Sequence, residues 1–353
     1  MLTQNEQKQY NRHLILEEIG LEGQEKLKNS KVLMIGAGGL GCPVLQYLTS
    51  AGVGTIGIID DDKVDQSNLQ RQVLYTVDDI GKPKVHMASQ KLSKLNPHVR
   101  FKTYNERLST LNILSIFAEY DIVVDGTDNF PAKYLINDGA IITKKPLVFG
   151  SIFKFEGQIS VFNFDNGPTY RCLFPEPPGE NALPNCSDIG VLGVLPGIIG
   201  GMMANEVLKM IVGIGVVLKG KLLRFDTLSM QQQILHFDKN INHEISRLDN
   251  DYGIFCGIKK TGTISSSDFK NNRNLYTLID VRNYSEYQEF NIGGYHIPLH
   301  ELESKASSIT NTKPIVLCCQ SGNRSKKAIQ ILTKLRKDLT LLNLEGGLNK
   351  FSL

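Results

Sequence analysis

The sequence of 353 residues has little excess of charge of either sign. Its 39 Lys and Arg residues are nearly balanced by 36 Asp and Glu residues, which leaves a formal net charge of +3. No dense block of basic residues stands out, whereas proteins that grip nucleic-acid phosphates usually carry one. We therefore expect no nucleic acid among its partners.

Cysteine is scarce and irregularly spaced, which excludes the disulfide framework of a small secreted domain. The six cysteines are Cys42, Cys172, Cys186, Cys256, Cys318 and Cys319. The first residues, 1–6, are polar and lack the apolar core of a secretory signal. Together these observations favour a protein of the reducing cytoplasm.

Long hydrophobic runs are also missing. The most apolar stretch, residues 190–204, is followed by Asn205, Glu206 and Lys209 before it reaches the roughly 20 residues that a membrane span requires. This pattern predicts a buried helix after a glycine-rich loop, and no membrane association.

The most informative stretch begins with the short apolar run 32–35, which is typical of a buried strand. Gly36-Ala-Gly-Gly39-Leu-Gly41 follows it directly as G-x-G-x-x-G, and a second apolar run, 56–59, ends on Asp60. Glycines let the backbone approach a phosphate, the helix start offers free N–H groups, and an acidic residue at this distance meets a ribose hydroxyl. The stretch predicts an adenine-nucleotide site that includes Gly39 and Asp60.

The residues that follow favour ATP over a dinucleotide. Ser67-Asn68-Leu-Gln-Arg71 comes soon after Asp60, and Lys84 comes 13 residues after Arg71. A glycine turn largely satisfies two phosphates, whereas a triphosphate that loses pyrophosphate needs cations to neutralise the shifting charge. Arg71 and Lys84 fit that role.

Strand and helix patterns alternate beyond Lys84, which predicts a parallel sheet covered by helices. Residues 146–164 then alternate as antiparallel strands do, so the fold class is α/β with a Rossmann-like, mixed sheet. Asp128 and Asn129 follow the apolar run 122–124, at the sheet edge where ligands bind. They are interpreted as nucleotide or Mg²⁺ contacts, although a turn or helix cap is the structural alternative.

These motifs resemble the MoeB/ThiF family of carrier-protein adenylyltransferases, relatives of the ubiquitin-activating enzymes, over about residues 10–237. The resemblance implies ATP and Mg²⁺ as cofactors, with Asp128 at the metal, and a homodimer in which Arg12 reaches the nucleotide of the partner subunit. On its own, Arg12 would be interpreted as a solvated helix charge. The implied nucleotide contacts are Arg12, Gly39, Asp60, Ser67, Asn68, Arg71, Lys84, Asp128 and Asn129.

The cysteines match the family pattern at one position and depart from it at the zinc-binding positions. Cys186 coincides with the position of the family's mobile-loop thiol, although a lone cysteine is more often a small buried hydrophobe. Many members hold zinc with two C-x-x-C pairs, but here Pro175 follows Cys172 and Gly253 precedes Cys256 at the partner positions. Two thiolates do not close a four-ligand site, so no bound zinc is expected.

A second unit follows a polar segment without apolar periodicity. We expect an adenylyltransferase domain at 1–245, a linker at 246–260 and a smaller α/β domain at 261–353. This smaller domain resembles a rhodanese domain in its strand 315–318, its cysteine loop 319–325 and the helix that follows. N–H groups and Arg324 would stabilise the thiolate of Cys319, while Cys318 packs inside. The loop has four residues between Cys319 and Arg324, and this short spacing favours sulfur over phosphate as the transferred group.

The two resemblances together imply an enzyme that adenylates the C-terminal glycine of a ubiquitin-like sulfur carrier. A persulfide on Cys319 then attacks the adenylate, and Cys186 releases a carrier thiocarboxylate. A MoaD-like carrier, of molybdopterin synthesis, is favoured over a ThiS-like carrier, of thiamine thiazole synthesis, and a cysteine desulfurase is the expected sulfur donor.

Two other classes of function are weighed against this one. An NAD-dependent oxidoreductase would need the glycine turn and Asp60, but it has no use for Arg71, Lys84 or a persulfide loop. A non-catalytic scaffold for carrier and donor would explain the missing zinc cysteines, but not the intact nucleotide residues.

The missing zinc ligands give a direct prediction. Metal analysis of the purified full-length chain by plasma mass spectrometry should find zinc far below one atom per chain, because two cysteines leave the tetrahedral site half built. One zinc per chain that resists dialysis against a chelator would contradict this assignment of the ligands.

Overall fold

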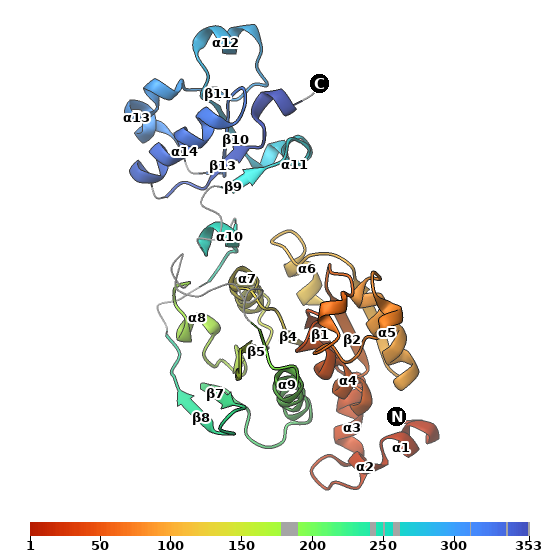
Figure 1. The fold of residues 1–353 in the computed structure, drawn as a ribbon. Helices are drawn as coiled ribbons and strands as arrows, with labels where there is room; N and C mark the ends of the chain where they lie inside the picture. The colour runs from red at the N-terminus through yellow and green to blue at the C-terminus, as the bar shows by residue number, and fades with distance from the viewer. Residues whose placement is uncertain are drawn as a thin grey trace. The chain divides into compact units, whose positions relative to one another are not determined.

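The computed structural model describes residues 1–177, 190–240, 245–249, 251–256, 262–310, 312–336 and 338–351. The chain divides into two compact units, Met1–Asp249 and Asn250–Leu353, and each unit contains its own sheet (Figure 1). The predicted linker, residues 246–260, includes this division.

An eight-stranded sheet, in the order β3-β2-β1-β4-β5-β6-β7-β8, is the centre of the first unit. The five strands from β3 to β5 pair in parallel, and β5 to β8 pair as antiparallel neighbours, so the predicted mixed sheet is confirmed. The strands are β1 Lys31–Ile35, β2 Thr55–Ile59, β3 Arg100–Tyr104, β4 Ile122–Asp125, β5 Leu147–Phe153, β6 Glu156–Phe162, β7 Lys221–Asp226 and β8 Gln232–His236.

Helices cover both faces of this sheet, as buried parallel strands require. Val32 and Met34 of β1 pack in one apolar cluster with side chains of α4, α5 and α9. Gly57 of β2 lies on the opposite face of the sheet, where the ring of Tyr120 packs against it. The described helices are α1 Gln4–Gln9, α2 Asn11–Leu14, α3 Gly20–Asn29, α4 Gly41–Ala51, α5 Lys84–Leu95, α6 Ile113–Ala118, α7 Phe130–Ile142, α8 Tyr170–Leu173 and α9 Leu195–Val212, with short 3-10 turns η1 Gln66–Asn68 and η2 Val77–Asp79.

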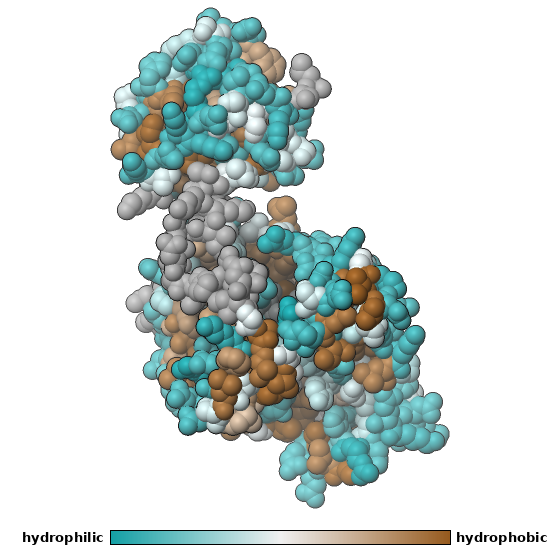
Figure 2. All heavy atoms as spheres, viewed as in Figure 1, coloured by the Kyte–Doolittle hydropathy of each residue, from teal (hydrophilic) through white to brown (hydrophobic). Residues whose placement is uncertain are grey.

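Helix α9 is the buried helix predicted from the apolar stretch. By length and composition alone it could cross a membrane, but half of its apolar window is buried inside this unit, against α3, α4, β5 and β6. Its partly buried residues Ile198, Met202 and Met210 contribute apolar surface, and Figure 2 shows hydrophobic residues gathered over the position of α9. The helix is a core element with one apolar side left partly uncovered.

The strand order places a topological switch point in the first unit. The chain runs from β1 outward to β2 and β3, and then returns to β4 on the other side of β1. In open α/β sheets, ligands bind beyond the carboxyl ends of the strands at such a point. Gly36, Asp60 and Gly126 directly follow the three strands that meet there.

The second unit is smaller and is built on a five-stranded sheet in the order β11-β10-β12-β13-β9, with every pair parallel. Ile315 and Leu317 of β12 face one apolar cluster, while Val316 and Cys318 face the other. Its strands are β9 Gly262–Ile264, β10 Thr277–Asp280, β11 Tyr295–His296, β12 Ile315–Cys318 and β13 Leu341–Leu344.

The described helices of this unit lie between and around these strands. They are α10 Tyr252–Phe255, α11 Ser266–Asn271, α12 Tyr284–Glu289, α13 Leu302–Lys305 and α14 Asn323–Leu335, with 3-10 turns η4 Arg273–Leu275, η5 Leu299–Glu301, η6 Ala306–Ser308 and η7 Gly347–Lys350. The predicted smaller α/β domain is therefore confirmed.

The packing of α4 predicts where the first unit is vulnerable. Leu48→Ala removes a side chain that is fully buried in the main cluster, so the free energy of unfolding should fall by about 2–5 kcal/mol. The neighbouring Tyr47→Ala is the control, because Tyr47 is 58% exposed. Urea unfolding followed by circular dichroism measures both, and equal stability of the two variants would contradict this core assignment.

Candidate functional site

The glycine turn lies between β1 and α4 and is as tight as the motif predicts. Gly36 has φ +88°, and a Cβ atom on Gly41 would lie 2.0 Å from the carbonyl oxygen of Gly36. A Cβ on Gly39 would lie 3.2 Å from Pro196 of α9 and 3.7 Å from Cδ of Arg71. Glycine is therefore required at Gly36 and Gly41, and the turn brings the first N–H groups of α4 to the carboxyl end of β1, where a helix start can bind an anion.

Asp60 follows β2 and holds the turn in place. One of its carboxylate oxygens accepts a hydrogen bond from N–H of Ala37 at 2.7 Å, and the other accepts one from N–H of Asp62 at 2.8 Å. Burial raises the pKa of Asp60, while the positive charge of Lys84 opposes that rise. Each oxygen keeps a second lone pair that a ribose hydroxyl can use.

Lys84 is the first residue of α5 and lies close to Asp60 and the glycine turn. Its side chain is only 5% exposed, and its ammonium group donates to Asp62 at 2.7 Å. Tyr75 links the glycine turn to the start of α5, because its hydroxyl lies 2.8 Å from the carbonyl oxygen of Ala37 and 3.4 Å from that of Lys84. Asp62 therefore balances a buried cation beside the turn.

The predicted run from Ser67 to Arg71 forms a compact polar segment beside the turn. Asp65 caps η1 by accepting hydrogen bonds from N–H and the hydroxyl of Ser67, at 2.8 and 2.5 Å. Arg71 donates to the carbonyl of Ser67 at 3.1 Å, and Asn68 donates to the Ser67 hydroxyl at 3.4 Å. Because Arg71 also lies near Gly39, this segment and the glycine turn form one site.

Asp128 and Asn129 lie on the segment that follows β4. Gly126 packs on Gly36, since a Cβ on Gly36 would lie 3.2 Å from the Gly126 carbonyl oxygen. Asn129 is the N-cap of α7, where its side-chain oxygen accepts a hydrogen bond from N–H of Ala132 at 3.0 Å. Asp128 is exposed and, among the hydrogen bonds of the described residues, accepts one long bond, 3.4 Å, from Asn129. Its carboxylate is a hard oxygen ligand of the kind that Mg²⁺ prefers.

In the second unit, the loop between β12 and α14 wraps around the sulfur of Cys319. N–H groups of Gly322 and Ser325 point at this sulfur, with nitrogen–sulfur distances of 3.2 and 3.4 Å, and the Ser325 hydroxyl lies 3.4 Å from it. Gly322 has φ +90°, a conformation that favours glycine, and this bend directs its N–H inward. The loop is the anion cradle that the sequence predicts.

The two adjacent cysteines are equally buried, yet their environments differ. Both are 0% exposed, on opposite faces of the sheet. Burial raises the pKa of Cys318 far above its ordinary range, and the nearby charge of Asp280 adds to the rise. Burial also acts on Cys319, but hydrogen bonds from Ser325 and from loop N–H groups outweigh it and lower the pKa of that thiol. Cys319 is therefore the better nucleophile.

Arg324 does not donate to the sulfur of Cys319 among the hydrogen bonds of the described residues. Its guanidinium instead makes two hydrogen bonds to Glu286, at 2.6 and 2.5 Å. Glu286 is the main cause that raises the pKa of Arg324, and the charge of Cys319 contributes in the same direction. Arg324 is therefore paired with Glu286, a partner that the sequence reasoning missed.

Known proteins resemble both units. Residues 10–246 match the ThiF family, and residues 265–353 match the rhodanese-like domain. The chain belongs to the ThiF family. It is 47% identical over 268 residues to a sulfur carrier protein adenylyltransferase of Thermus thermophilus, covering 73% of this chain and 99% of that protein.

A second relative spans both units. The probable adenylyltransferase/sulfurtransferase MoeZ of Mycobacterium tuberculosis is 39% identical over 366 residues, covering 98% of this chain and 93% of MoeZ. A crystal structure of E. coli MccB with ATP shares the fold, with a TM-score of 0.56, 22% identity, and coverage of 63% of this chain and 68% of MccB. The predicted family, and an adenylyltransferase with a sulfurtransferase domain as the enzyme class, are confirmed.

Within one chain of this ThiF-family protein, Arg12 is not brought to the glycine turn. It lies exposed on α2, two residues after Tyr10. The ring of Tyr10 packs against Gly52 at the carboxyl end of α4. The glycine turn is at the amino end of α4, and the 11 residues of this helix span about 16 Å. The segment that carries Arg12 and the glycine turn therefore lie at opposite ends of α4.

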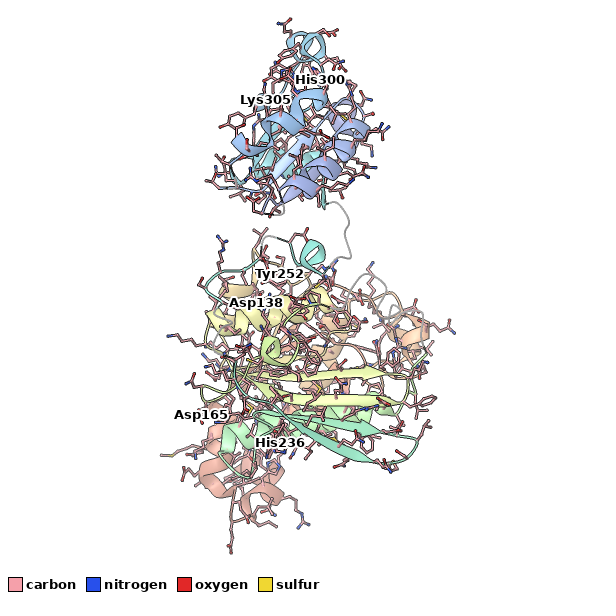
Figure 3. The ribbon with its side chains drawn as sticks, turned by 90° about the vertical axis from the view of Figure 1, so that its left-hand side faces the viewer. Asp138, Asp165, His236, Tyr252, His300 and Lys305 are labelled. Carbon is pink, nitrogen blue, oxygen red and sulfur yellow. The ribbon has the colours of Figure 1, made fainter. Side chains whose placement is uncertain are left out.

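The segment around Cys172, where many members of the family carry a zinc-binding cysteine pair, makes other contacts here. The Cys172 sulfur accepts hydrogen bonds from N–H of Thr169 and N–H of Asn240, both at 3.3 Å. Arg171 makes two hydrogen bonds to Asp138, labelled in Figure 3 on α7, at 2.8 and 2.7 Å, and lies 3.6 Å from Asp249 near the end of this unit. These contacts attach the segment of Arg171 and Cys172 to α7 and to residues near the end of this unit.

The site also contains residues that the sequence reasoning missed. Gln72 is 4% exposed, its side-chain oxygen has no hydrogen-bond partner in the described residues, and its side-chain nitrogen lies 3.6 Å from the position of a Cβ on Gly38. Such an unsatisfied buried acceptor beside the turn fits a site that a ligand completes. Its only signal in the sequence is its place directly after Arg71. The predicted Cys186 lies outside the described residues.

The cradle predicts how Cys319 ionises. Because its pKa is lowered, the thiolate should persist below about pH 8.5, the ordinary midpoint of a cysteine thiol, and be lost only as pH falls through the lower value. Ser325→Ala removes the hydroxyl next to the sulfur, so the pH profile of Cys319 alkylation by iodoacetamide should move to higher pH. Mass spectrometry of the Cys319 peptide measures the rate at each pH.

Ser321→Ala is the matched control for this experiment. Ser321 influences the sulfur through its backbone N–H, which the substitution keeps, so its profile should coincide with that of the unchanged chain. A Ser325→Ala profile that also coincides with the unchanged chain would show that the hydroxyl does not stabilise the thiolate.

Proposed function

We propose that this protein uses ATP to adenylate the C-terminal glycine of a ubiquitin-like sulfur carrier, and then replaces AMP with sulfur held on Cys319. The observation that carries the proposal is the cluster of Asp60, Arg71 and Lys84 around a glycine turn in a chain that also contains a thiolate cradle. The family match and the ATP complex of the structurally similar MccB support ATP as the nucleotide.

The first reaction makes a poor acyl donor reactive. A carboxylate oxygen of the carrier attacks the α-phosphorus of ATP, an acyl-adenylate forms, and pyrophosphate leaves with the electrons of the broken bond. Arg71 and Lys84 neutralise charge on the phosphates, N–H groups of the turn bind them, and Asp60 holds the ribose. Asp128 would hold Mg²⁺, which neutralises phosphate charge when it is bound.

The second reaction transfers sulfur. A persulfide on Cys319 attacks the acyl carbon, AMP leaves, and the carrier is joined to Cys319 through a disulfide. The thiolate of Cys186 then attacks the Cys319 sulfur, which frees the carrier thiocarboxylate and leaves a Cys186–Cys319 disulfide for a thiol reductant. The persulfide is supplied by a protein donor such as a cysteine desulfurase.

The proposed assembly is a cytoplasmic homodimer. Two observations support the dimer: Arg12 lies at the opposite end of α4 from its own glycine turn, and one side of α9 leaves apolar surface partly uncovered. A second copy that covered apolar surface and delivered Arg12 would complete the nucleotide site. We favour a MoaD-like carrier, and a ThiS-like carrier is the alternative for the same chemistry.

Carrier-dependent exchange of labelled pyrophosphate into ATP tests the adenylation. Arg71→Ala and Asp128→Ala should each lower exchange by about 100-fold or more, because each removes a charge that stabilises the phosphates or their metal. Asp78→Ala, an exposed carboxylate on η2, is the control for loss of one negative charge. Exchange with MoaD-like and ThiS-like carriers in parallel identifies the carrier.

Cys319→Ala separates the two reactions in the same assay. It should keep pyrophosphate exchange and abolish formation of the carrier thiocarboxylate, which mass spectrometry detects as a gain of 16 Da, the difference between sulfur and oxygen. An undiminished thiocarboxylate would remove Cys319 from the mechanism, and normal exchange by Arg71→Ala and Asp128→Ala would remove the glycine-turn site.

A further inference from the structure

The ion pair of Arg324 and Glu286 lies beside the Cys319 cradle and has no role in the reactions described above. The two guanidinium nitrogens of Arg324 each donate to a different carboxylate oxygen of Glu286, at 2.6 and 2.5 Å. The side chains of Arg324 and Glu286 are 33% and 30% exposed, so the pair is accessible to solvent on one side. This fork-to-fork geometry is also the one by which arginine binds small oxyanions.

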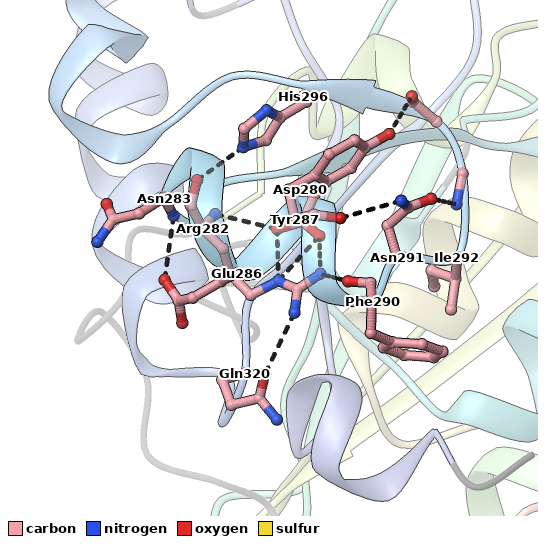
Figure 4. A network of polar contacts seen from close by, with 12 residues as sticks. Asp280, Arg282, Asn283, Glu286, Tyr287, Phe290, Asn291, Ile292, His296 and Gln320 are labelled. Atoms are coloured by element: carbon pink, nitrogen blue, oxygen red, sulfur yellow. Dashed lines mark hydrogen bonds and ion pairs between the residues drawn. The ribbon is translucent and has the colours of Figure 1, made fainter.

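Arg324 is the charged side chain next to the nucleophile. It lies in the first turn of α14, directly before Ser325, whose N–H points at the Cys319 sulfur. Arg282 is close to the same loop, but it is 2% exposed, and its guanidinium is held by Asp280, by the carbonyl of Phe290 and by Gln320 (Figure 4). Arg282 is therefore occupied, and Arg324 is the arginine of this loop that an incoming anion can reach.

Glu286 is fixed by its own helix as well as by Arg324. It is the third residue of α12 and takes part in a capping box, in which it accepts a hydrogen bond from N–H of Asn283 at 3.1 Å; Figure 4 shows this bond. Arg324 lowers the pKa of Glu286 to about 2, so the carboxylate stays charged at any physiological pH. The chain thus places a permanent, ordered anion on the guanidinium beside Cys319.

We propose that Glu286 is a specificity-determining residue that occupies the anion-binding side of Arg324 and thereby disfavours small dianionic sulfur donors, such as thiosulfate, at Cys319. This inference rests on the proposed role of Cys319 as the sulfur acceptor. A dianion must displace the carboxylate or approach it against charge repulsion, whereas a persulfide presented by a protein needs no sulfonate contact with Arg324.

The reaction with thiosulfate defines the test chemically. The Cys319 thiolate attacks the outer sulfur of thiosulfate, a sulfur–sulfur bond forms, and the bond to the sulfonate sulfur breaks. Sulfite leaves with that electron pair, so the product is a Cys319 persulfide and no proton or external oxidant is consumed. Cyanide then accepts the outer sulfur as thiocyanate, which is measured by its colour with ferric iron.

Glu286→Gln in the full-length chain removes the charge and keeps the shape. Glutamine also serves at the third position of a capping box, so α12 should remain folded. We expect KM for thiosulfate to fall about threefold or more, in the range that exposed ion pairs contribute, with kcat little changed. Glu289→Gln is the matched control, because it removes one exposed carboxylate from the same helix and should leave KM unchanged.

An unchanged or higher KM for Glu286→Gln would overturn the proposal, as would an equal fall in Glu289→Gln. A loss of kcat at constant KM would also overturn it, because Glu286 would then position Arg324 for the chemistry instead of blocking it. Folding is checked by circular dichroism for both variants.

A second measurement needs no turnover. Inorganic sulfate, an inert dianion, should protect Cys319 from iodoacetamide at a lower concentration in Glu286→Gln than in Glu289→Gln, by a factor similar to the change in KM. Equal half-protection concentrations would overturn the inference. If sulfate protection shifts but Cys319→Ala still forms the carrier thiocarboxylate, the proposed role of Cys319 fails while the anion competition by Glu286 stands.

Discussion

Backbone N–H groups that converge where a buried parallel strand turns into a helix are the feature on which both candidate sites depend. In the first unit β1 runs into the glycine turn and α4, and in the second β12 runs into the cysteine loop and α14. Each turn exposes donors that the helix itself leaves unpaired, and each therefore favours negative charge. The same backbone geometry thus offers hydrogen-bond donors to an anion in both units.

Local patterns predicted much of this arrangement. Gly36 to Gly41, Asp60 and the cysteine loop are sequential motifs whose geometry follows from the residues themselves, and the structure brings Arg71 and Lys84 to the same turn. The mixed sheet followed from alternating apolar runs. Side-chain function was less visible: the oxygen of Asn129 caps α7, which is the structural alternative that the sequence had left open.

The sequence did not predict contacts between side chains that are far apart in the chain. Glu286 lies 38 residues from Arg324, and Asp249 lies 78 residues from Arg171, so no spacing rule connects them. The burial of Gln72 depends on the packing around Gly38, which no local pattern encodes. Removing one partner of a buried ion pair such as that of Arg171 and Asp138 costs several kcal/mol, because the other charge is left buried without compensation. Such a contact matters for stability, yet no pattern in the sequence reveals it.

The complete burial of Cys319 has a consequence for the lifetime of its sulfur. A reactive thiolate that peroxide reaches freely is oxidised to the sulfenic form and then to the irreversible sulfinic form. With 0% of Cys319 exposed, the resting loop shields the atom, and reagents gain entry only during brief local opening. A reactive sulfur and its protection from oxidants are therefore combined in a single loop.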